Sequence, residues 1–363
     1  MTVDTPPGAG SGVAVAWPDV LVTLMRREDL AVADVEAVMT QILEGGATDA
    51  QIAGFIVALR AKGETPAELA ALVRTMLRFA TTVPVDPEAP GRPPLVDTCG
   101  TGGDRSHTFN ISTVAAIVVA GAGGKVAKHG NRAASSRCGS ADLLEELGVA
   151  VELGPEGVAR CIDEVGIGFF FAPRYHPSMR FAGPVRKELG APTTFNFLGP
   201  LANPARVRRQ VLGVSDPAMA ERMIGTLAEL GTTRAMVFFG HDGLDELTTS
   251  DVSTLLELRD GEVHARVLEP FDLGIERSFA EDLRGGSPQD NAAIARRVLA
   301  GDPGPLRDVV ALNAAAALVV TDAAADFVEG LEQARASIDS GRASATLERW
   351  IELSRELMAA EAG

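Results

Sequence analysis

The stretch Leu95-Val96-Asp97-Thr98-Cys99-Gly100-Thr101-Gly102-Gly103-Asp104 decides the fold. A short apolar run, Leu95-Val96, ends in a loop with three glycines, and the apolar residues 114–122 follow as a helix-compatible stretch. The order of strand, glycine loop and helix N-terminus directs backbone N–H groups and a positive dipole end toward an anion. Glycines also let the backbone approach oxygen atoms closely. The stretch therefore predicts a phosphate-binding site.

Further polar segments follow at the spacing of one βα unit. Asn110-Ile111-Ser112-Thr113 stands at the start of the helix-compatible stretch, where its side chains add neutral donors. Lys128-His129-Gly130-Asn131-Arg132 adds cations, and the polar loop Ser135-Ser136-Arg137-Cys138-Gly139-Ser140 comes next. A lone glycine-rich loop is often only a tight turn, whereas these segments together strengthen the prediction.

From Leu95 onward, apolar strand-like runs alternate with helical patterns. The helical patterns cover residues 141–147, 156–165 and 218–230, and the strand candidates are residues 126–127, 149–153, 167–171, 211–212 and 235–239. This alternation predicts an α/β domain with a mostly parallel central sheet and ligands at the carboxyl ends of its strands. Asp260-Gly261, between two apolar runs, predicts one antiparallel hairpin.

The N-terminal part of the chain predicts helices. An apolar pattern at helical spacing covers residues 35–43. Thr48 and Thr65 each begin a capping box, with Gln or Glu three residues later. The proline-rich residues 81–94 form a predicted linker, and residues 1–17, rich in Pro, Gly and Ser, a predicted disordered segment.

Composition excludes several classes of protein. The 363 residues are 46% hydrophobic and 23% charged, which is typical of a globular chain with room for two domains. The formal net charge of −16 argues against nucleic acid as the main partner, so an anionic ligand requires locally concentrated cations. The three cysteines do not suit a disulfide scaffold or a zinc site, and no apolar run reaches the roughly 20 residues that span a bilayer. Without the pattern of a signal peptide, the chain is expected in the cytoplasm.

Six motifs occur in a fixed order along the chain: Gly-Thr-Gly-Gly-Asp at 100–104, Asn-Ile-Ser-Thr at 110–113, Lys-His-Gly-Asn-Arg at 128–132, Gly-Pro-Val-Arg at 183–186, Phe-Asn-Phe-Leu-Gly-Pro-Leu-Ala-Asn-Pro at 195–204 and Gly-Leu-Asp-Glu-Leu at 243–247. Together they resemble the motif set of the anthranilate phosphoribosyltransferase family. The resemblance spans roughly residues 18–357, and an ordered set is far more specific than any single motif.

The resemblance implies a fold, an assembly and an activity. It implies a small all-α domain, residues 18–94 with part of 174–204, through which the family forms homodimers. A hinge joins this domain to a larger α/β catalytic domain, residues 95–173 and 205–363. The implied activity transfers the phosphoribosyl group of 5-phosphoribosyl 1-diphosphate to the amine of anthranilate and releases diphosphate, in tryptophan biosynthesis.

Asp245-Glu246 is the strongest candidate for a metal site. The pair follows the apolar run 235–239, where the active-site loops of α/β proteins belong. Magnesium typically takes one or two carboxylates and completes its octahedron with phosphate oxygens and water. The resemblance implies two magnesium ions per subunit, with the Ser112 hydroxyl as a further ligand.

The resemblance also assigns residues to the two substrates. Gly100, Asn131 and Arg186 are the predicted anthranilate contacts, and the planar guanidinium of Arg186 suits a carboxylate. Arg186 is expected to face the cleft from the side opposite the glycine loop. The predicted contacts of the phosphoribosyl donor are Gly100, Gly103, Asp104, Thr108, Asn110, Ile111, Ser112, Thr113, Lys128, His129, Gly130, Asn131, Arg132, Ala133, Ala134, Ser135, Ser136 and Ser140.

No catalytic base is predicted. Because an aromatic amine is already neutral near pH 7, catalysis needs only positioning and stabilisation of the leaving diphosphate. No His-Asp or Cys-His couple is evident in the motifs. His129 and His176, the histidines nearest the motifs, are expected to pack or form hydrogen bonds rather than to transfer protons.

Two other functions are alternatives. Pyrimidine nucleoside phosphorylases share the fold, but they carry Lys-His-Ser before a glycine turn where this chain has Lys128-His129-Gly130-Asn131. They also lack a close equivalent of Gly243-Leu244-Asp245-Glu246. A non-enzymatic relative that binds nucleic acid needs a basic surface stripe and eroded motifs, and this acidic chain shows neither.

Overall fold

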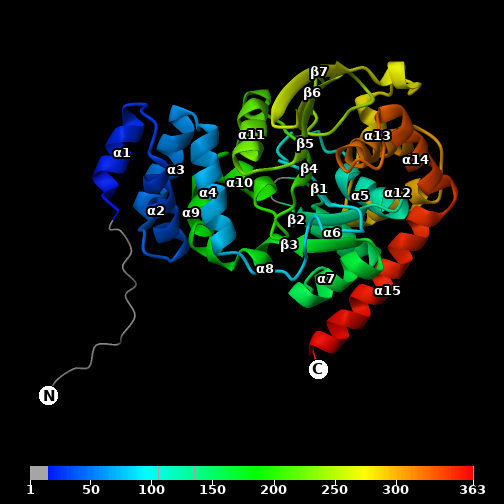
Figure 1. The fold of residues 1–363 in the computed structure, drawn as a ribbon, viewed down its shortest axis with the longest axis horizontal. Coiled ribbons are helices and arrows are strands. Elements are labelled where there is room, and N and C mark those ends of the chain that lie inside the picture. Colours follow the sequence, from blue (N-terminus) through cyan, green and yellow to red (C-terminus); the bar gives the residue numbers. More distant parts are fainter. Residues whose placement is uncertain (1–14, 105, 134–135, 363) are drawn as a thin grey trace.

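A bundle of helices from the N-terminal part of the chain forms one side of the molecule (Figure 1). The computed structural model describes residues 15–104, 106–133 and 136–362. Both predicted capping boxes are confirmed, because Thr48 and Thr65 each accept a hydrogen bond from the backbone N–H three residues on. The apolar faces of the bundle pack into one core. Its helices are α1 (Trp17–Met25), α2 (Val32–Leu43), α3 (Asp49–Lys62) and α4 (Pro66–Arg78).

The described strands form one sheet in the order β3-β2-β1-β4-β5-β6-β7. The parallel strands are β1 (Leu95–Gly100), β2 (Lys125–Gly130), β3 (Ile167–Phe171), β4 (Arg209–Gly213) and β5 (Arg234–Gly240). The predicted hairpin is confirmed as the antiparallel pair β6 (Ser253–Arg259) and β7 (Glu262–Leu268), with positive φ at both turn residues, Asp260 and Gly261. The strand order reverses between β1 and β4, which is where open α/β sheets bind ligands.

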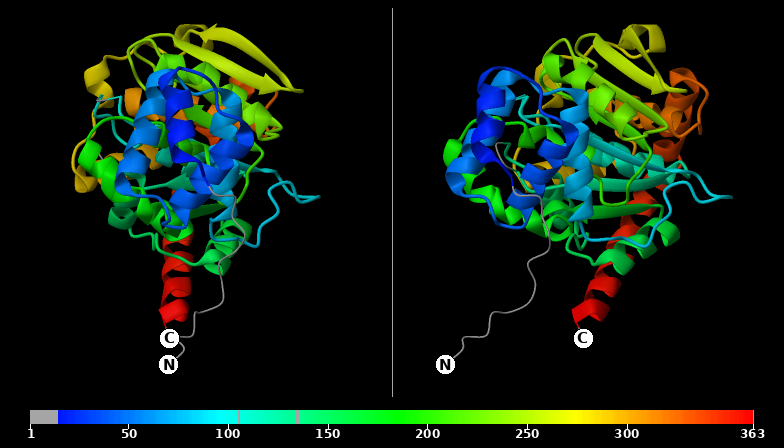
Figure 2. Two further views of the ribbon diagram at one scale, coloured as in Figure 1. Left: turned by 90° about the vertical axis from the view of Figure 1, so that its left-hand side faces the viewer. Right: turned by 60° about the vertical axis from the view of Figure 1, so that its left-hand side comes forward.

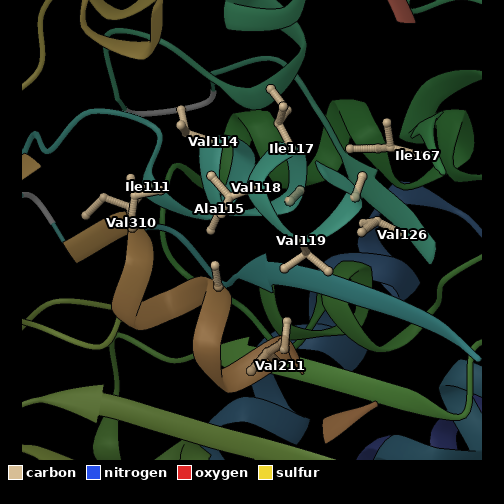
Figure 3. Packing of buried hydrophobic residues seen from close by; sticks show 14 of the residues in the cluster. Ile111, Val114, Ala115, Ile117, Val118, Val119, Val126, Ile167, Val211 and Val310 are labelled. Atoms are coloured by element: carbon tan, nitrogen blue, oxygen red, sulfur yellow. The ribbon is translucent and has the colours of Figure 1, made fainter. Parts of the chain in front are cut away.

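Helices cover both faces of the sheet. On one face, α5 (Ile111–Gly121) packs against β1 and β2, and α13 (Pro305–Val320) against β4 and β5. Figure 3 shows Ile111, Val118 and Val119 of α5 in this core, with Val310 of α13 nearby. On the other face, α11 (Pro217–Glu229) packs against β5, β6 and α4. The core of the bundle therefore continues into that face of the sheet.

The remaining long helices surround the first face of the sheet. They are α6 (Ser140–Leu147), α7 (Pro155–Glu164), α12 (Pro288–Leu299), α14 (Phe327–Asp339) and α15 (Arg342–Ala362). α15 packs against α5 and α7, and its C-terminal end projects from the molecule (Figure 2). In the part of the chain that the structure describes, no helix is long and apolar enough to cross a membrane.

Between β3 and β4 the chain returns to the bundle. The return segment consists of α8 (Ala172–Tyr175), the 3-10 helix η1 (Pro177–Phe181), α9 (Gly183–Leu189) and α10 (Phe195–Leu201). α9 packs against α3, and α10 packs against α4 (Figure 1). The Gly-Pro-Val-Arg motif therefore lies on the bundle side of the molecule.

The strand predicted at residues 149–153 is wrong. The backbone N–H of Ala150 donates to the Ser354 hydroxyl (3.0 Å), and that of Gly154 donates to the Glu361 carboxylate (2.9 Å). Both acceptors lie on α15, and the N–H of Val149 donates to the carbonyl of Leu144 in α6, so the backbone N–H groups here bond to helices and not to a neighbouring strand. The valines and the leucine of this range are buried. The alternation of buried and open residues thus arises from packing against a helix.

The predicted disordered segment 1–17 extends too far at its end. Trp17 begins α1 and is buried, because its ring packs edge-on against Phe55 of α3 at 6.4 Å between ring centroids. Residues 1–14, which make up most of that prediction, lie outside the described residues.

Candidate active site

The glycine loop leaves the carboxyl end of β1 and is fastened to the end of β4. Gly102 and Gly103 have φ of 67° and 84°, a region that glycine adopts without strain. The N–H of Thr101 donates to the carbonyl of Gly213 (3.0 Å), and the hydroxyl of Ser215 donates to the carbonyl of Gly102 (2.8 Å). The conformation of the loop therefore depends on β1, which it follows, and on the end of β4, to which it is bonded.

Asp245 and Glu246 lie after β5, directly against the ends of β1 and β4. A Cβ atom at Gly213 would overlap the carbonyl of Asp245, and one at Gly100 would overlap its carboxylate. The carboxylate of Asp245 accepts a hydrogen bond of 2.6 Å from the N–H of Gly102. Glycines at both strand ends therefore allow the acidic pair to reach the glycine loop.

The two carboxylates of this pair are buried together, with 9% and 8% of each residue exposed. Glu246 accepts a hydrogen bond of 3.2 Å from the N–H of Ser112, in the first turn of α5. Burial raises the pKa of both carboxyl groups; the charge of Asp104 raises the pKa of Asp245 further, and the charge of Asp245 does the same to Glu246. Like charges buried side by side favour a cation between or beside them.

These donors fit magnesium. Among the described residues, no group of three or more His, Cys, Asp or Glu side chains is arranged to hold a metal ion alone. Two carboxylates do lie next to Ser112, whose backbone N–H donates to Glu246, and the carboxylate and hydroxyl groups are all hard oxygen donors. Magnesium needs only one or two carboxylates when phosphate oxygens and water complete its octahedron. The residues present therefore suit an ion that arrives with a phosphate ligand.

The N-terminus of α5 is held by two asparagines. Asn110, its N-cap, donates from its side-chain amide to the carbonyl of Cys138 (3.0 Å) and accepts from the amide of Asn291 (2.9 Å). Asn291 is a buried residue of α12 and also accepts from the N–H of Gly286 (2.7 Å). α12 thus fixes the helix N-terminus and, through Cys138, the polar loop that follows β2.

Lys128 points from β2 toward β1. The residue is 2% exposed, and its Nζ donates to the carbonyl of Thr98. Burial lowers the pKa of its ammonium group, and the charge of Asp97 partly offsets this effect. A buried cation with only a carbonyl as hydrogen-bond partner favours an anionic ligand.

His129 and His176 lie beside each other, with 5.2 Å between their ring centroids. His129 donates from Nδ1 to the carbonyl of Gly199 (3.0 Å), and His176 donates from Nε2 to the carbonyl of Ala202 (2.9 Å). Burial lowers the pKa of His129 to about 3 and that of His176 to about 4. Two neutral rings bound to carbonyls support the expected packing and hydrogen-bonding roles.

In the polar loop after β2, the described side chains of Asn131 and Arg132 are engaged by other groups of the chain. The guanidinium of Arg132 pairs with Glu145 and Asp142 of α6 and stacks on the ring of Phe171 at 5.3 Å. The side chain of Asn131 accepts from the N–H of Arg132 (2.8 Å). Arg132 is therefore engaged by carboxylates of its own chain, unlike Lys128.

The other predicted donor contacts are distributed around the same edge of the sheet. Ile111 and Thr113 are buried in the first turn of α5, and Thr108 bridges to Arg284. The N–H of Ala133 donates to Asp142, and the hydroxyl of Ser140 to the carbonyl of Asn131. Gly130 ends β2, and Ser136 is exposed. Ala134 and Ser135 lie outside the described residues.

Arg186 lies on α9, on the bundle side. Its Nε is buried without a hydrogen-bond partner among the described residues. Burial lowers the pKa of its guanidinium, and no carboxylate offsets this. A half-buried guanidinium whose Nε has no partner, and which no carboxylate of the described chain neutralises, favours a ligand with a carboxylate of its own.

Sequence reasoning missed the residue that holds the acidic turn. Asn313 of α13 accepts from the N–H of Leu247 (3.1 Å) and donates to the carbonyl of the same residue (2.9 Å). It thereby binds the residue after the acidic pair as a neighbouring strand would. The only signal in the sequence is a single amide within the apolar run 309–320. The sequence gives no indication of the role of Asn291 either, because both asparagines bond to residues far away in the chain.

The chain is similar to known proteins over most of its length. The helical bundle domain of a glycosyl transferase family matches residues 18–80, and the a/b domain of a glycosyl transferase family matches residues 92–344. The anthranilate phosphoribosyltransferase of Chloroflexus aggregans is 54% identical over 339 residues, which cover 93% of this chain and 98% of that protein.

Solved structures agree with these matches. The anthranilate phosphoribosyltransferase of Thermus thermophilus is 43% identical, with a TM-score of 0.86 over 93% of this chain and 99% of that one. The Saccharomyces cerevisiae enzyme in complex with PRPP and Mg is 28% identical, with a TM-score of 0.85 over 96% of this chain and all of that one. The same yeast enzyme has been solved in complex with 4-fluoroanthranilate.

The burial of His176 predicts a loss of stability in acid. The unfolded chain takes up a proton on this histidine below about pH 6.5, whereas the folded chain does so only near pH 4. The contribution of neutral His176 to the free energy of unfolding is therefore complete above pH 6.5, and it is lost as the pH falls from 6.5 toward 4. The free energy of unfolding, measured in urea, should fall between pH 7 and pH 5 by about 2 kcal/mol more in the wild type than in His176→Gln. The exposed His264, changed to Gln, is the control. Equal losses in the wild type and His176→Gln would show that this histidine is not buried neutral.

Proposed function

The chain belongs to the anthranilate phosphoribosyltransferase family, and we propose that its glycine loop, the N-terminus of α5 and Lys128 bind the phosphoribosyl donor. The reaction transfers the phosphoribosyl group of 5-phosphoribosyl 1-diphosphate to the anthranilate amine and releases diphosphate, in tryptophan biosynthesis. The chain is thus a pentosyltransferase. Neither a pyrimidine nucleoside phosphorylase nor a nucleic-acid-binding relative is favoured by the similarities.

One observation carries the donor-site proposal. The N–H groups of Gly102 and Ser112 already donate to carboxylate oxygens, those of Asp245 and Glu246. These N–H groups are therefore directed at positions where a negative oxygen is stable, which is what phosphate binding at a glycine loop and helix N-terminus requires. The remaining donor contacts named from the sequence belong to the same proposal.

Magnesium is the cofactor, and we assign its carboxylate ligands to Asp245 and Glu246 with the Ser112 hydroxyl. The two carboxyl groups belong to adjacent residues, and each accepts a hydrogen bond from a different element, the glycine loop for Asp245 and α5 for Glu246. The proposal includes two ions per subunit, one beside each carboxylate, with phosphate oxygens and water as further ligands. Bound magnesium neutralises charge on the diphosphate as that group leaves.

Arg186 is assigned to the anthranilate carboxylate. Its Nε is buried without a hydrogen-bond partner, no carboxylate of the described chain offsets the charge, and the guanidinium has the planar fork that binds two carboxylate oxygens. Because α9 belongs to the bundle side and the glycine loop to the sheet, the two substrates would approach each other from opposite sides. Gly100 and Asn131 complete the proposed anthranilate contacts.

The chemistry then needs no general base. The bond from C1 of the ribose to the diphosphate oxygen breaks, and the neutral amine nitrogen forms the new bond to C1. The amine proton leaves to water after the bond has formed. The protein contributes orientation, through Arg186 and the glycine loop, and stabilises the leaving charge through N–H groups and Lys128.

We also propose a cytoplasmic homodimer that forms through the bundle. The bundle exposes four large apolar side chains among the described residues, Val22 and Met25 of α1, Val32 of α2 and Val57 of α3, and Met25 is 69% exposed. A bundle with this much open apolar surface is more stable when a second copy covers it. All three cysteines are free and buried, as expected in a reducing compartment.

The direct test of the proposed function is product formation. Purified protein with both substrates should form phosphoribosyl-anthranilate and diphosphate in equal amounts when magnesium is present, and neither product when a chelator removes it. Formation of a free ribose phosphate from a nucleoside would point to the phosphorylase instead.

The assignment of the metal ligands predicts the behaviour of a double variant. Asp245→Asn with Glu246→Gln should lower kcat by about 10²-fold or more, because the main charge stabiliser of the leaving group is lost. Calorimetry should show that magnesium no longer strengthens donor binding. The matched control is Asp260→Asn with Glu262→Gln, an exposed acidic pair in the β6–β7 turn. Magnesium-dependent activity near the wild-type level in the first variant rejects the assignment.

The assignment of Arg186 predicts a selective loss. Arg186→Ala should raise KM for anthranilate by roughly thirtyfold, or about 2 kcal/mol, because one charge-assisted contact disappears. KM for the donor should change by less than about threefold. Lys187→Ala, at the exposed neighbour on α9, is the control. Equal effects of Arg186→Ala on both substrates would indicate a structural role.

The dimer proposal predicts a monomer when charge enters the open apolar face. Met25→Glu should lower the mass measured by light scattering from that of two chains to that of one, because a buried unpaired carboxylate opposes association. Val267→Glu, at an equally open position on β7, should leave the mass unchanged. A monomeric wild type, or a dimer that survives Met25→Glu, contradicts the proposal.

A further inference from the structure

Asp97 is a fully buried carboxylate for which the proposed reaction has no use. It lies on β1 and is 0% exposed. Its Oδ1 accepts the backbone N–H of His129 (3.1 Å), and its Oδ2 accepts the side-chain amide of Asn203 (2.8 Å). A buried carboxylate is costly unless hydrogen bonds and a cation offset its lost hydration. The hydrogen bonds are present, and a nearby cation is needed to offset the remaining cost of burying the charge.

Lys128 is that cation. It precedes His129 on β2, is itself 2% exposed, and donates from Nζ to the carbonyl of Thr98, the residue after Asp97. Burial lowers the pKa of the Lys128 ammonium, and Asp97 is the largest opposing influence, followed by Cys99 and Glu246. Burial likewise raises the pKa of Asp97 to about 6, and Lys128 is the largest influence in the other direction. The two side chains come from the neighbouring strands β1 and β2 and share no hydrogen bond or ion pair in the described chain, so each charge favours the other across a longer distance.

Asn203 holds Asp97 in place from a different part of the chain. Its amide donates to the carbonyl of Ala127 (2.7 Å) as well as to Asp97, and its own carbonyl oxygen accepts the N–H of Ala205 (2.9 Å). All of its hydrogen-bonding groups are therefore used in one fixed orientation. Asn203 comes two residues after α10, at the end of the return segment.

The same short segment is fastened to the sheet at several points. The carbonyl of Gly199 accepts from His129 (3.0 Å), that of Pro200 from Gln210 (2.6 Å), and that of Ala202 from His176 (2.9 Å). In the part of the segment that the structure describes, these three bonds go to backbone carbonyls, whereas the bond of Asn203 goes to the carboxylate of Asp97. The charge beside Lys128 thus depends on correct docking of the segment that leads from the bundle to β4.

We propose that Asp97 is a positioning residue that keeps the Lys128 ammonium charged and directed at the diphosphate of the donor, with Asn203 holding the Asp97 carboxylate in place. The inference rests on the proposed function, in which Lys128 binds the donor. Loss of the charge at position 97 then weakens donor binding through Lys128. Anthranilate binding, assigned to Arg186 on the bundle side, changes little.

A double-mutant cycle separates this role from a purely structural one. The probe is 5-phosphoribosyl 1-diphosphate with magnesium, titrated calorimetrically into the wild type, Asp97→Asn, Lys128→Met and the double variant. Asp97→Asn keeps the shape of the side chain and should weaken donor binding by roughly tenfold to a hundredfold, the size of a lost charge-assisted interaction. The double variant should bind no more weakly than Lys128→Met, because the two side chains act as a unit.

Steady-state kinetics supply a second readout. KM for anthranilate in Asp97→Asn should stay within about threefold of the wild type, which a general disturbance of the fold would not allow. The matched control is Asp163→Asn. Asp163 raises the pKa of Lys125 as Asp97 raises that of Lys128, but Lys125 begins β2 whereas Lys128 lies near its end. This control should bind the donor as the wild type does.

Three outcomes overturn the inference. The first is that Asp97→Asn binds the donor with wild-type affinity. The second is that the losses of donor affinity in Asp97→Asn and Lys128→Met multiply in the double variant. The third is that Asp97→Asn raises KM for both substrates equally. If Asp97→Asn does not fold, Asn203→Ala takes its place, with an expected three- to tenfold loss of donor affinity and the same failure to multiply. Wild-type affinity in Asn203→Ala would then overturn it. Failure of the proposed function looks different: the wild type does not bind the donor, or Lys128→Met has no effect, and in that case the inference falls with it.

Discussion

The close approach of the acidic turn to the ends of β1 and β4 is the contact on which the site depends. Gly100 and Gly213 end these strands, and a side chain on either would occupy the space of Asp245. β1 and β4 are parallel neighbours at the point where the strand order reverses, so their carboxyl ends meet at one edge. Chain connection then brings the glycine loop and α5 to the same edge. The position of every proposed metal ligand follows from this contact.

The two sides of the site, the sheet and the helical bundle, are held in place by different contacts. On the sheet side, α5 and α13 share a continuous apolar core, and Asn313 of α13 holds the acidic turn. On the bundle side, α4 meets α11 through apolar contacts, and Arg60–Asp216 (2.8 Å) and Arg222–Glu64 (3.1 Å) are ion pairs at the same junction. The Arg60–Asp216 pair is partly exposed and contributes little stability, whereas the Glu64 carboxylate is fully buried and requires a cation such as Arg222. The apolar contact between α4 and α11 and this buried ion pair together set where the bundle, and with it Arg186, stands relative to the glycine loop.

Local patterns predicted the parts of the fold that local physics determines. The capping boxes at Thr48 and Thr65, the Asp260-Gly261 turn and the order of loop and helix all depend on residues a few positions apart, and the structure contains each of them. The strand predicted at 149–153 was wrong because α15, some 200 residues later in the chain, supplies its hydrogen-bond partners.

The amides that support the site escaped prediction for the same reason. Asn291 bonds Asn110 across 181 residues, Asn203 bonds Asp97 across 106, and Asn313 bonds Leu247 across 66. Nothing in the neighbourhood of a single asparagine indicates such a partner. The motif residues were recognisable, whereas the side chains that orient them acquire their roles only when distant segments of the chain pack together.

An acidic protein that binds a polyanion must limit competition from its own carboxylates. With a net charge of −16, most cations of this chain are already paired, and Arg132 illustrates this through its bonds to Glu145 and Asp142. Such a cation must break ion pairs before it can bind a ligand, which cancels part of the gain. Lys128 and Arg186 are different, because neither hydrogen-bonds a carboxylate in the described chain. Lys128 is buried near the charge of Asp97, and the Nε of Arg186 is buried without a hydrogen-bond partner. Neither cation must break an ion pair to bind an anion, so these two cations should contribute more to substrate affinity than Arg132.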